Sequence, residues 1–292
     1  MYTLGAGRVG WLLASIAMTL VPEFWQTFRF GCFAEVGIVV MSHFISPRLY
    51  PLAYPDHKKW LWHTTAAAVF PAFAVPYYAI PGTRLLWEEK ASLASVVSAP
   101  PNLWLWQALG FAIAHFCVDG IIMAGKREMF VRAMRRPLYL QMMAHHVLSV
   151  VLWPYAFSVS ACVVAVGYFM ATEVTNIFLN TRWFLAERNV GGALMAIYGA
   201  IFFLVYTVGR ILTIPFAVWV VISTNWTAYA AARTRPVLDT FLTLTCVIPF
   251  ALNIFWYSLI LKGLVKMFKP KPPTKKEMDP ICIEESRNSD SN

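Results

Sequence analysis

The chain has 292 residues, of which 59% are hydrophobic and only 13% are charged. Soluble domains carry about one quarter charged residues, so this composition excludes a soluble globular domain and indicates a multi-pass membrane protein. The net charge of +9 does not indicate nucleic-acid binding, because the basic residues gather at the edges of apolar runs, where they orient a membrane protein and attract anionic headgroups.

Seven apolar segments are each long enough to cross the hydrocarbon core, which takes roughly 20 residues. They are predicted at 25–46, 60–80, 103–124, 138–156, 158–182, 193–222 and 238–262. The alternation typical of a transmembrane β-barrel is absent, so we expect an all-α, multi-pass transmembrane helical bundle. Prolines within or beside the spans predict kinks that neighbouring helices must repair. Pro154 is predicted to mark a tight turn between the fourth and fifth spans.

Three regions are predicted along the chain. Residues 1–49 form an N-terminal segment with the first span, 50–266 a membrane domain of six spans, and 267–292 a polar tail, expected to be disordered and cytosolic. The apolar piece 9–21 is short for a span. It is compatible with an interfacial segment, with half of a crossing broken at Pro22, and with a signal peptide.

Loop charge predicts the orientation of the bundle. The loops 47–59 and 125–137 and the C-terminal tail are rich in lysine and arginine, whereas the charges of 81–102 cancel. The positive-inside rule therefore places the basic loops and the C-terminus in the cytosol. The loop 225–236 opposes this with two arginines, and it also carries an N-x-[ST] sequon at Asn225, whose glycosylation is left open.

Ionisable and amide side chains inside the spans are the candidates for a functional site, because such groups are costly in a bilayer and normally face the bundle interior. Nine of them are expected to converge: His115, Asp119, His145, His146, Thr172, Glu173, Asn176, Asn180 and Arg210.

Each of these residues also has a purely structural interpretation. His115 and Asp119, four residues apart on one helix face, could form a local pair. His146 could be interfacial, and Asn180 could lie at the cytosolic end of its span. Glu173 would be neutral if buried alone and charged if paired with a histidine or with Arg210. The histidines and Asp119 are metal-ligand types, but nothing in their spacing enforces a site, so neither a metal nor a cofactor is predicted.

The histidine pair has further sequence context. It is followed by Leu152 and, about 28 positions after its first member, by the stretch "TEVTNIFLNTRWF" (172–184); "DHKKWLWHTTAAAV" (56–69) and "GFAIAHFCVDGIIM" (110–123) lie upstream. This combination resembles the TLC-domain family, which includes the ceramide synthases and several small proteins with little beyond the domain. The resemblance covers roughly residues 50–266 and is closest to the small proteins.

The resemblance implies six helices around a membrane-embedded tunnel, with a preceding span. It also implies that His145 stands where ceramide synthases accept the acyl group of acyl-CoA, a role that an imidazole beside a carboxylate can perform. Counting without gaps, Thr172 and Glu173 replace the His-Asp of those enzymes and Asn176 replaces their second Asp. An amide cannot accept a proton, so this departure argues against N-acylation of sphingoid bases.

Four functions are compatible with these features. The favoured one is binding of a membrane lipid (acyl chain, phospholipid or sphingolipid) in the tunnel, contributing to lipid homeostasis in the endoplasmic reticulum or another endomembrane. The second is an acyltransferase with His145 as acyl carrier, Glu173 as its partner and acyl-CoA as substrate. The third is a trafficking or cargo adaptor addressed by its lysine-rich tail. A proton-coupled transporter ranks last, because no inverted repeat is visible.

Overall fold

The computed structural model describes residues 21–51, 54–89, 93–244 and 247–268. Most of the apolar piece 9–21 and of the tail 267–292 lies outside these residues, so the alternatives for both stay open. All the long elements are helices: α2 (Pro22–Ile45), α3 (Asp56–Ala67), α4 (Val69–Glu88), α6 (Leu103–Gly125), α8 (Arg136–Ser158), α9 (Val163–Thr172), α10 (Thr175–Glu187), α11 (Gly192–Tyr206), α12 (Ile214–Ser223) and α15 (Val247–Phe268).

Short elements connect these helices at the two ends of the bundle. They are the 3-10 turn η1 (Ser46–Arg48), α5 (Leu93–Val97), α7 (Arg127–Met134), α13 (Trp226–Ala231) and α14 (Pro236–Leu244). Four of the predicted loops contain helical turns. The loop at 125–137 holds α7, the loop at 225–236 holds α13, 81–102 holds α5 and the last turns of α4, and 47–59 holds most of η1 and the first turn of α3.

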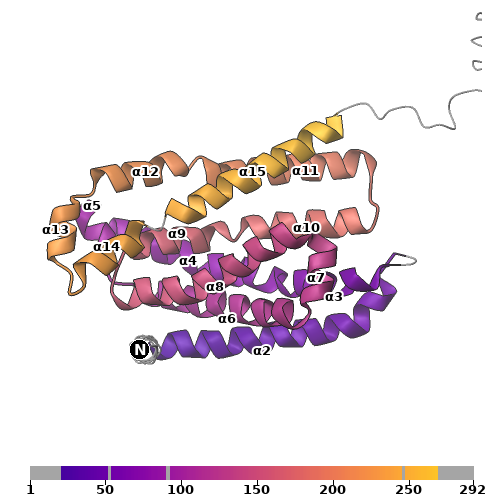
Figure 1. Cartoon of the computed structure of the whole chain (residues 1–292), viewed down its shortest axis with the longest axis horizontal. Helices are drawn as coiled ribbons and strands as arrows, with labels where there is room; N and C mark the ends of the chain where they lie inside the picture. The colour runs from indigo at the N-terminus through magenta and orange to yellow at the C-terminus, as the bar shows by residue number, and fades with distance from the viewer. Residues whose placement is uncertain (1–20, 52–53, 90–92, 245–246, 269–292) are drawn as a thin grey trace, which may run out of the picture.

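Five helical segments are long and apolar enough to cross a membrane, judged by length and composition of the described residues. They are Pro22–Arg48, Leu103–Gly125, Val163–Glu187, Gly192–Ile211 and Ile248–Val265. The helices α4 and α8 are not among the five, since prolines and polar residues interrupt their apolar runs, but both pack on α6 and run lengthwise through the bundle (Figure 1). The prediction of an all-α, multi-pass helical bundle is confirmed.

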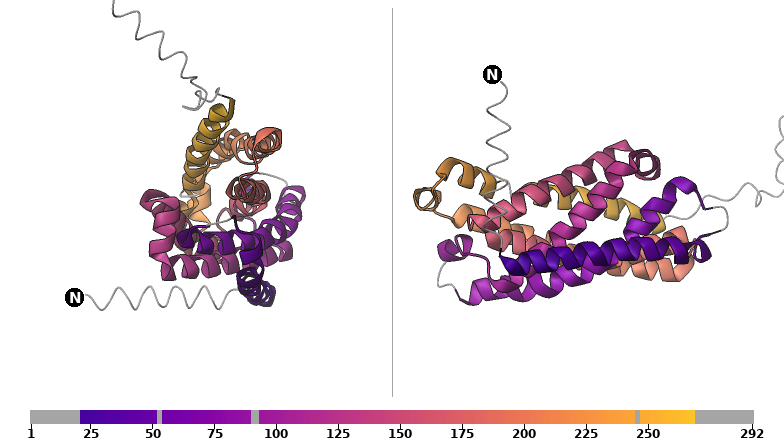
Figure 2. Two further views of the ribbon diagram at one scale, coloured as in Figure 1. Left: turned by 90° about the vertical axis from the view of Figure 1, so that its right-hand side faces the viewer. Right: turned by 90° about the horizontal axis from the view of Figure 1, so that it is seen from below.

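The helix α6 lies at the centre of the core, with α2, α4 and α8 packed around it. Leu105, Leu109 and Phe116 of α6 are almost completely buried. Gly110 lets α2 approach closely, because a Cβ atom there would lie 2.0 Å from the Thr27 hydroxyl and 2.6 Å from the Phe24 carbonyl. Small residues at such contacts are typical of helix packing in membranes. Viewed end-on, α2 lies on one outer side of the bundle and α11, α12 and α15 on the opposite side (Figure 2).

The prediction of a turn at Pro154 is wrong. Pro154 is a buried residue inside α8, which continues to Ser158. The chain reverses at 159–162 instead, where Ser160 and Cys162 have φ of 51° and 52°. A proline removes only one helical hydrogen bond, and in a membrane the neighbouring helices can compensate for that loss.

Three predicted spans are not continuous helices. The span at 158–182 is interrupted at Glu173 and Val174, between α9 and α10. The span at 193–222 passes through a π-helical turn at Thr207–Ile211 before α12, and the span at 60–80 is divided at Ala68 between α3 and α4. Such interruptions are tolerated at membrane depth where protein groups satisfy the freed backbone atoms.

The basic elements gather at one end of the bundle. Figure 1 shows η1, α7 and the C-terminal end of α15 at the same end, with α5 and α13 at the other. The loops that the positive-inside rule assigns to the cytosol thus share one side.

Candidate functional site

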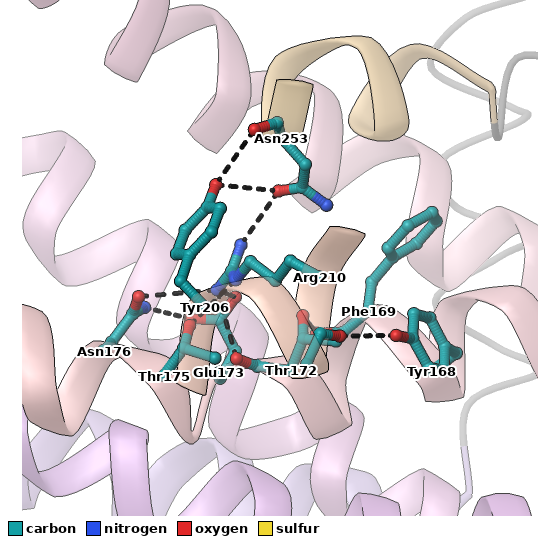
Figure 3. A network of polar contacts seen from close by, with 10 residues as sticks. Tyr168, Phe169, Thr172, Glu173, Thr175, Asn176, Tyr206, Arg210 and Asn253 are labelled. Atoms are coloured by element: carbon teal, nitrogen blue, oxygen red, sulfur yellow. Dashed lines mark hydrogen bonds and ion pairs between the residues drawn. The ribbon is translucent and has the colours of Figure 1, made fainter. Parts of the chain in front are cut away.

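Arg210 is the centre of a buried polar network that joins three helical segments (Figure 3). Arg210 as a whole residue is 7% exposed. The guanidinium group donates from Nε to the Thr175 hydroxyl (2.8 Å) and from Nη1 to the Asn253 amide oxygen (3.2 Å). From Nη2 it donates to the Thr172 backbone carbonyl (3.2 Å), and Nη2 also lies 3.4 Å from Glu173 Oε1. A planar cation with five N–H donors is suited to such a set of acceptors.

The helix interruptions explain how this network forms. Arg210 lies in the π-helical turn that follows α11, and Thr172 and Glu173 lie where α9 ends. A helix end leaves backbone carbonyls without helical partners, and the Thr172 carbonyl is one that Arg210 satisfies. π-Helical turns occur frequently at functional sites. The end of α9 and the π-helical turn after α11 therefore meet at the ion pair between Arg210 and Glu173.

Glu173 is held by two partners in this network. Its carboxylate accepts a hydrogen bond from the Asn176 side-chain amide and pairs with Arg210. The Asn176 amide oxygen in turn accepts from Arg210 at 3.4 Å. Of the alternatives for Glu173, the structure therefore has the pairing with Arg210.

A second polar cluster lies between α2, α6 and α8. His115 Nδ1 is 3.1 Å from Glu35 Oε2, and His146 Nε2 is 3.4 Å from Asp119 Oδ2. His115 and Asp119 thus have partners on other helices rather than only each other, and His146 is buried inside the bundle. Within the described residues, Glu35 Oε1 and His146 Nδ1 are buried without a hydrogen-bond partner. A polar atom of a ligand or a water molecule would satisfy such groups.

His145 lies beside this second cluster and faces an apolar chamber. Its imidazole contacts the rings of Phe116 and Trp256, with centroids 5.2 and 6.0 Å away. Together with Trp153 and Phe169 it lines a cavity of about 60 Å³ between α8, α9 and α15. Among the described residues, the hydrogen bonds of Glu173 go to Asn176 and Arg210, and none goes to His145.

Phe169 connects the two clusters. It lines the same chamber as His145, and its backbone carbonyl accepts a hydrogen bond from the Thr172 hydroxyl. Of the nine residues selected from the sequence, Arg210, Thr172, Glu173 and Asn176 are in direct contact, and His115, Asp119, His145 and His146 form the neighbouring group. Asn180 is buried on α10, and its amide nitrogen has no partner within the described part of the chain.

Four further residues take part that the sequence analysis did not select. They are Glu35, Thr175, Tyr206 and Asn253. Glu35 is an ionisable residue in the first span and 1% exposed, so the cost of burying charge in a bilayer would have indicated it. Asn253 is a lone amide in the last span, and the Tyr206 hydroxyl donates to its carbonyl at 3.3 Å. In the sequence, Asn253 and Tyr206 are distinguished from their apolar neighbours only by their polarity.

A larger cavity lies next to the Arg210 network. It has a volume of about 340 Å³ and lies between α4, α9, α12, α13 and α15. Its wall is almost entirely apolar and includes Trp87, Tyr168 and Phe250, and the Tyr168 hydroxyl donates to the carbonyl of Gly209, the neighbour of Arg210. Phe169 of the small chamber and Phe250 of the large cavity are in contact, with ring centroids 4.9 Å apart and ring planes tilted by 58°. This aromatic pair stands between the two spaces.

Metal ligation has no support in the described residues, where no group of three or more histidine, cysteine, aspartate or glutamate side chains could hold an ion. The fold and the site thus define a multi-pass helical membrane protein whose broken helices enclose buried polar clusters beside apolar cavities. The family model of the TLC domain matches residues 56–262, and the chain belongs to this family. No curated protein and no solved structure matches the chain.

Proposed function

We propose that this protein binds a membrane lipid inside the helical bundle and contributes in this way to membrane lipid homeostasis. The observation that carries the proposal is the apolar cavity of about 340 Å³ beside the Arg210 network. Ligand pockets in proteins measure roughly 300–1,000 Å³ and combine an apolar wall with a few polar groups. The cavity supplies the wall for an acyl chain, and the polar clusters supply hydrogen-bond donors and acceptors for a headgroup.

The wall of this cavity reaches the outer surface of the bundle at α12 and α15. Ile222 on α12 and Ile254 on α15 both line the cavity and are 77% and 54% exposed. In a bilayer these surfaces face lipid, so a chain can pass from the membrane into the cavity without crossing water. A lipid, rather than a soluble metabolite, fits this access.

Lipid analysis of the purified full chain tests the proposal. Mass spectrometry of the wild type is expected to find bound lipid, and Ala165→Phe, which places a ring in the cavity wall, is expected to reduce its amount severalfold. The matched control is Ala200→Phe, because Ala200 is exposed on α11 and lines none of the described cavities. Equal lipid content in the wild type and both variants would contradict the proposal.

Acyl transfer is a second candidate, favoured by the position of His145 on the wall of the small apolar chamber. In this reaction an imidazole nitrogen attacks the thioester carbonyl of acyl-CoA, a C–N bond forms, the C–S bond breaks, and coenzyme A leaves as the thiolate. The acyl group then passes to a lipid acceptor, which gives up a proton. Glu173 serves as the partner of His145 only if its carboxylate leaves Arg210, to which it is bound here.

Intact-protein mass spectrometry after incubation with acyl-CoA separates the two candidates. An adduct of acyl mass that is lost in His145→Ala and retained in His57→Ala supports transfer. Unmodified protein that carries non-covalent lipid supports binding without chemistry.

We further propose that the chain resides in the endoplasmic reticulum or another endomembrane with its basic end in the cytosol. The gathering of η1, α7 and the end of α15 on one side supports this orientation. A tag placed after Asn292 is then accessible to antibody when only the plasma membrane is permeabilised. A tag that is accessible only after the endomembranes are opened would show the opposite orientation.

A further inference from the structure

An apolar depression at the basic end lies on the outside of the bundle, away from the polar clusters. It is a groove of about 590 Å³ between α2, α3 and α10, with Met41, Ile45, Trp62 and Phe184 among its walls. Arg188, which follows the last residue of α10, stands at its rim.

A second groove of about 480 Å³ continues the first one along α4. The two share Ile38 and Ala66, and the second extends to Phe73 and Tyr77. From Trp62 to Tyr77 the path follows 15 helical residues, roughly 20 Å at 1.5 Å per residue. One leaflet of the hydrocarbon core is about 15 Å deep. The combined groove is therefore long enough to accompany an acyl chain from the headgroup region to the bilayer centre.

Arg188 lines the headgroup end of this groove, and Arg48 is the sequence neighbour of Leu49, which lines it too. Arg48 donates from Nη1 to the Phe44 carbonyl at 3.2 Å, and Arg188 donates from Nη1 to the carbonyl of Leu49, the residue next to Arg48. These contacts use one donor atom of each arginine, which leaves other N–H groups for a ligand. Both side chains are exposed.

The carboxylate of the residue before Arg188 is already neutralised. Glu187 precedes Arg188 and pairs with Lys58 at 2.9 Å, so it does not oppose an anion at the arginines. Guanidinium groups are well suited to phosphate oxygens, and basic residues at a membrane edge attract anionic lipid.

We propose that this outer groove is a binding site for an anionic glycerophospholipid, with the phosphate at Arg48 and Arg188 and one acyl chain along Ile38, Ala66 and Phe73. An anionic lipid fits this groove because the arginines at one end complement its phosphate. The apolar wall then continues over the depth of one leaflet, which suits an acyl chain. The site is separate from the internal cavity and does not depend on its function.

Photolabelling tests the proposal in the full chain reconstituted into phosphatidylcholine nanodiscs. The probe is phosphatidic acid with a diazirine on its acyl chain, and the labelled peptides are identified by mass spectrometry. Labels are expected on α2 and α4, in the peptides that hold Ile38 and Phe73. Ala66→Trp, which obstructs the junction of the two grooves, is expected to remove most of this labelling.

The headgroup end is tested by charge. Arg48→Gln and Arg188→Gln are each expected to lower labelling about fivefold, because a basic residue near an anionic surface contributes about that factor. The matched controls are the single variants Arg127→Gln and Arg132→Gln, each of which removes one charge from an exposed position on α7 at the same end. The thermal unfolding of every variant is measured, and only variants that unfold like the wild type are compared.

Three outcomes would overturn the proposal. Labelling of the same peptides by a phosphatidylcholine probe to the same extent would remove the role of the anionic headgroup. An equal loss of labelling in the α7 controls would show that the effect comes from general surface charge rather than from this site. A disulfide formed between two copies of Met41→Cys in the nanodisc would make a second copy of the chain the occupant.

Discussion

The Arg210 guanidinium donates to the backbone carbonyl of Thr172 at 3.2 Å, across 38 positions of sequence. The donor lies in a π-helical turn and the acceptor at the end of α9. The contact satisfies a carbonyl that the break in the helix leaves without a partner, in a medium where water cannot replace it. The same guanidinium neutralises Glu173.

Replacing Arg210 with methionine should destabilise the protein strongly. The change leaves Glu173, 14% exposed at its side chain, as an uncompensated charge, and breaking a buried pair in this way costs about 3–5 kcal/mol. Thermal unfolding in a mild detergent measures the effect. The double variant Arg210→Met with Glu173→Gln should recover part of the loss, because it removes both charges. If the double variant is less stable than the sum of the single changes, the ion pair is not the cause.

Glu35→Ala should also destabilise the bundle, with a cost of about 3 kcal/mol or more for the partner left unpaired. Glu35 is 1% exposed and contacts His115 across the interface of α2 and α6. Glu35→Gln keeps a hydrogen-bonding group at this position and should cost less. The control is Gln26→Ala, an exposed position on the same helix, which should unfold within about 0.5 kcal/mol of the wild type. Equal stability of Glu35→Ala and Gln26→Ala would contradict the assigned contact.

Two glycine-to-alanine changes should have opposite effects. At Gly110 the new methyl group would lie 2.0 Å from the Thr27 hydroxyl and must push α2 away from α6. Overpacking of this kind costs typically about 1–3 kcal/mol. At Gly37 on α2 a Cβ atom meets nothing within 4 Å, so alanine should be neutral or stabilising by up to about 1 kcal/mol. Unfolding of both variants under identical conditions provides the comparison, and a harmless Gly110→Ala would show that the helices are further apart.

Phe169→Leu should change the lipid that the protein retains. Phe169 contacts Phe250 between the chamber that His145 lines and the larger apolar cavity. A smaller side chain at this position opens space between the two, so longer acyl chains should be enriched among the lipids that co-purify. The substitution should lower the free energy of unfolding by only about 1–2 kcal/mol, roughly the range for changes of shape between apolar side chains. Chain lengths identical to the wild type in a stable variant would contradict the connection.

The fold class and most of the polar site could be predicted from local features of the sequence. Long apolar runs require helices that bury their own backbone groups in a bilayer, and each polar residue inside such a run costs enough to be conspicuous. Eight of the nine residues selected on this basis lie in the two neighbouring clusters. Glu35 would have followed from the same argument applied to the first span.

The pairings and the helix breaks were decided by tertiary structure. Glu173 is 37 positions from Arg210 and 28 from His145, and no local pattern states which of these it contacts. His115 meets Glu35 across 80 positions because α2 packs on α6, which depends on shape at Gly110. The sequence by itself determined that these charges lie within a membrane bundle. Only packing determined their partners, since burial is a property of a single residue whereas a contact requires two surfaces to fit.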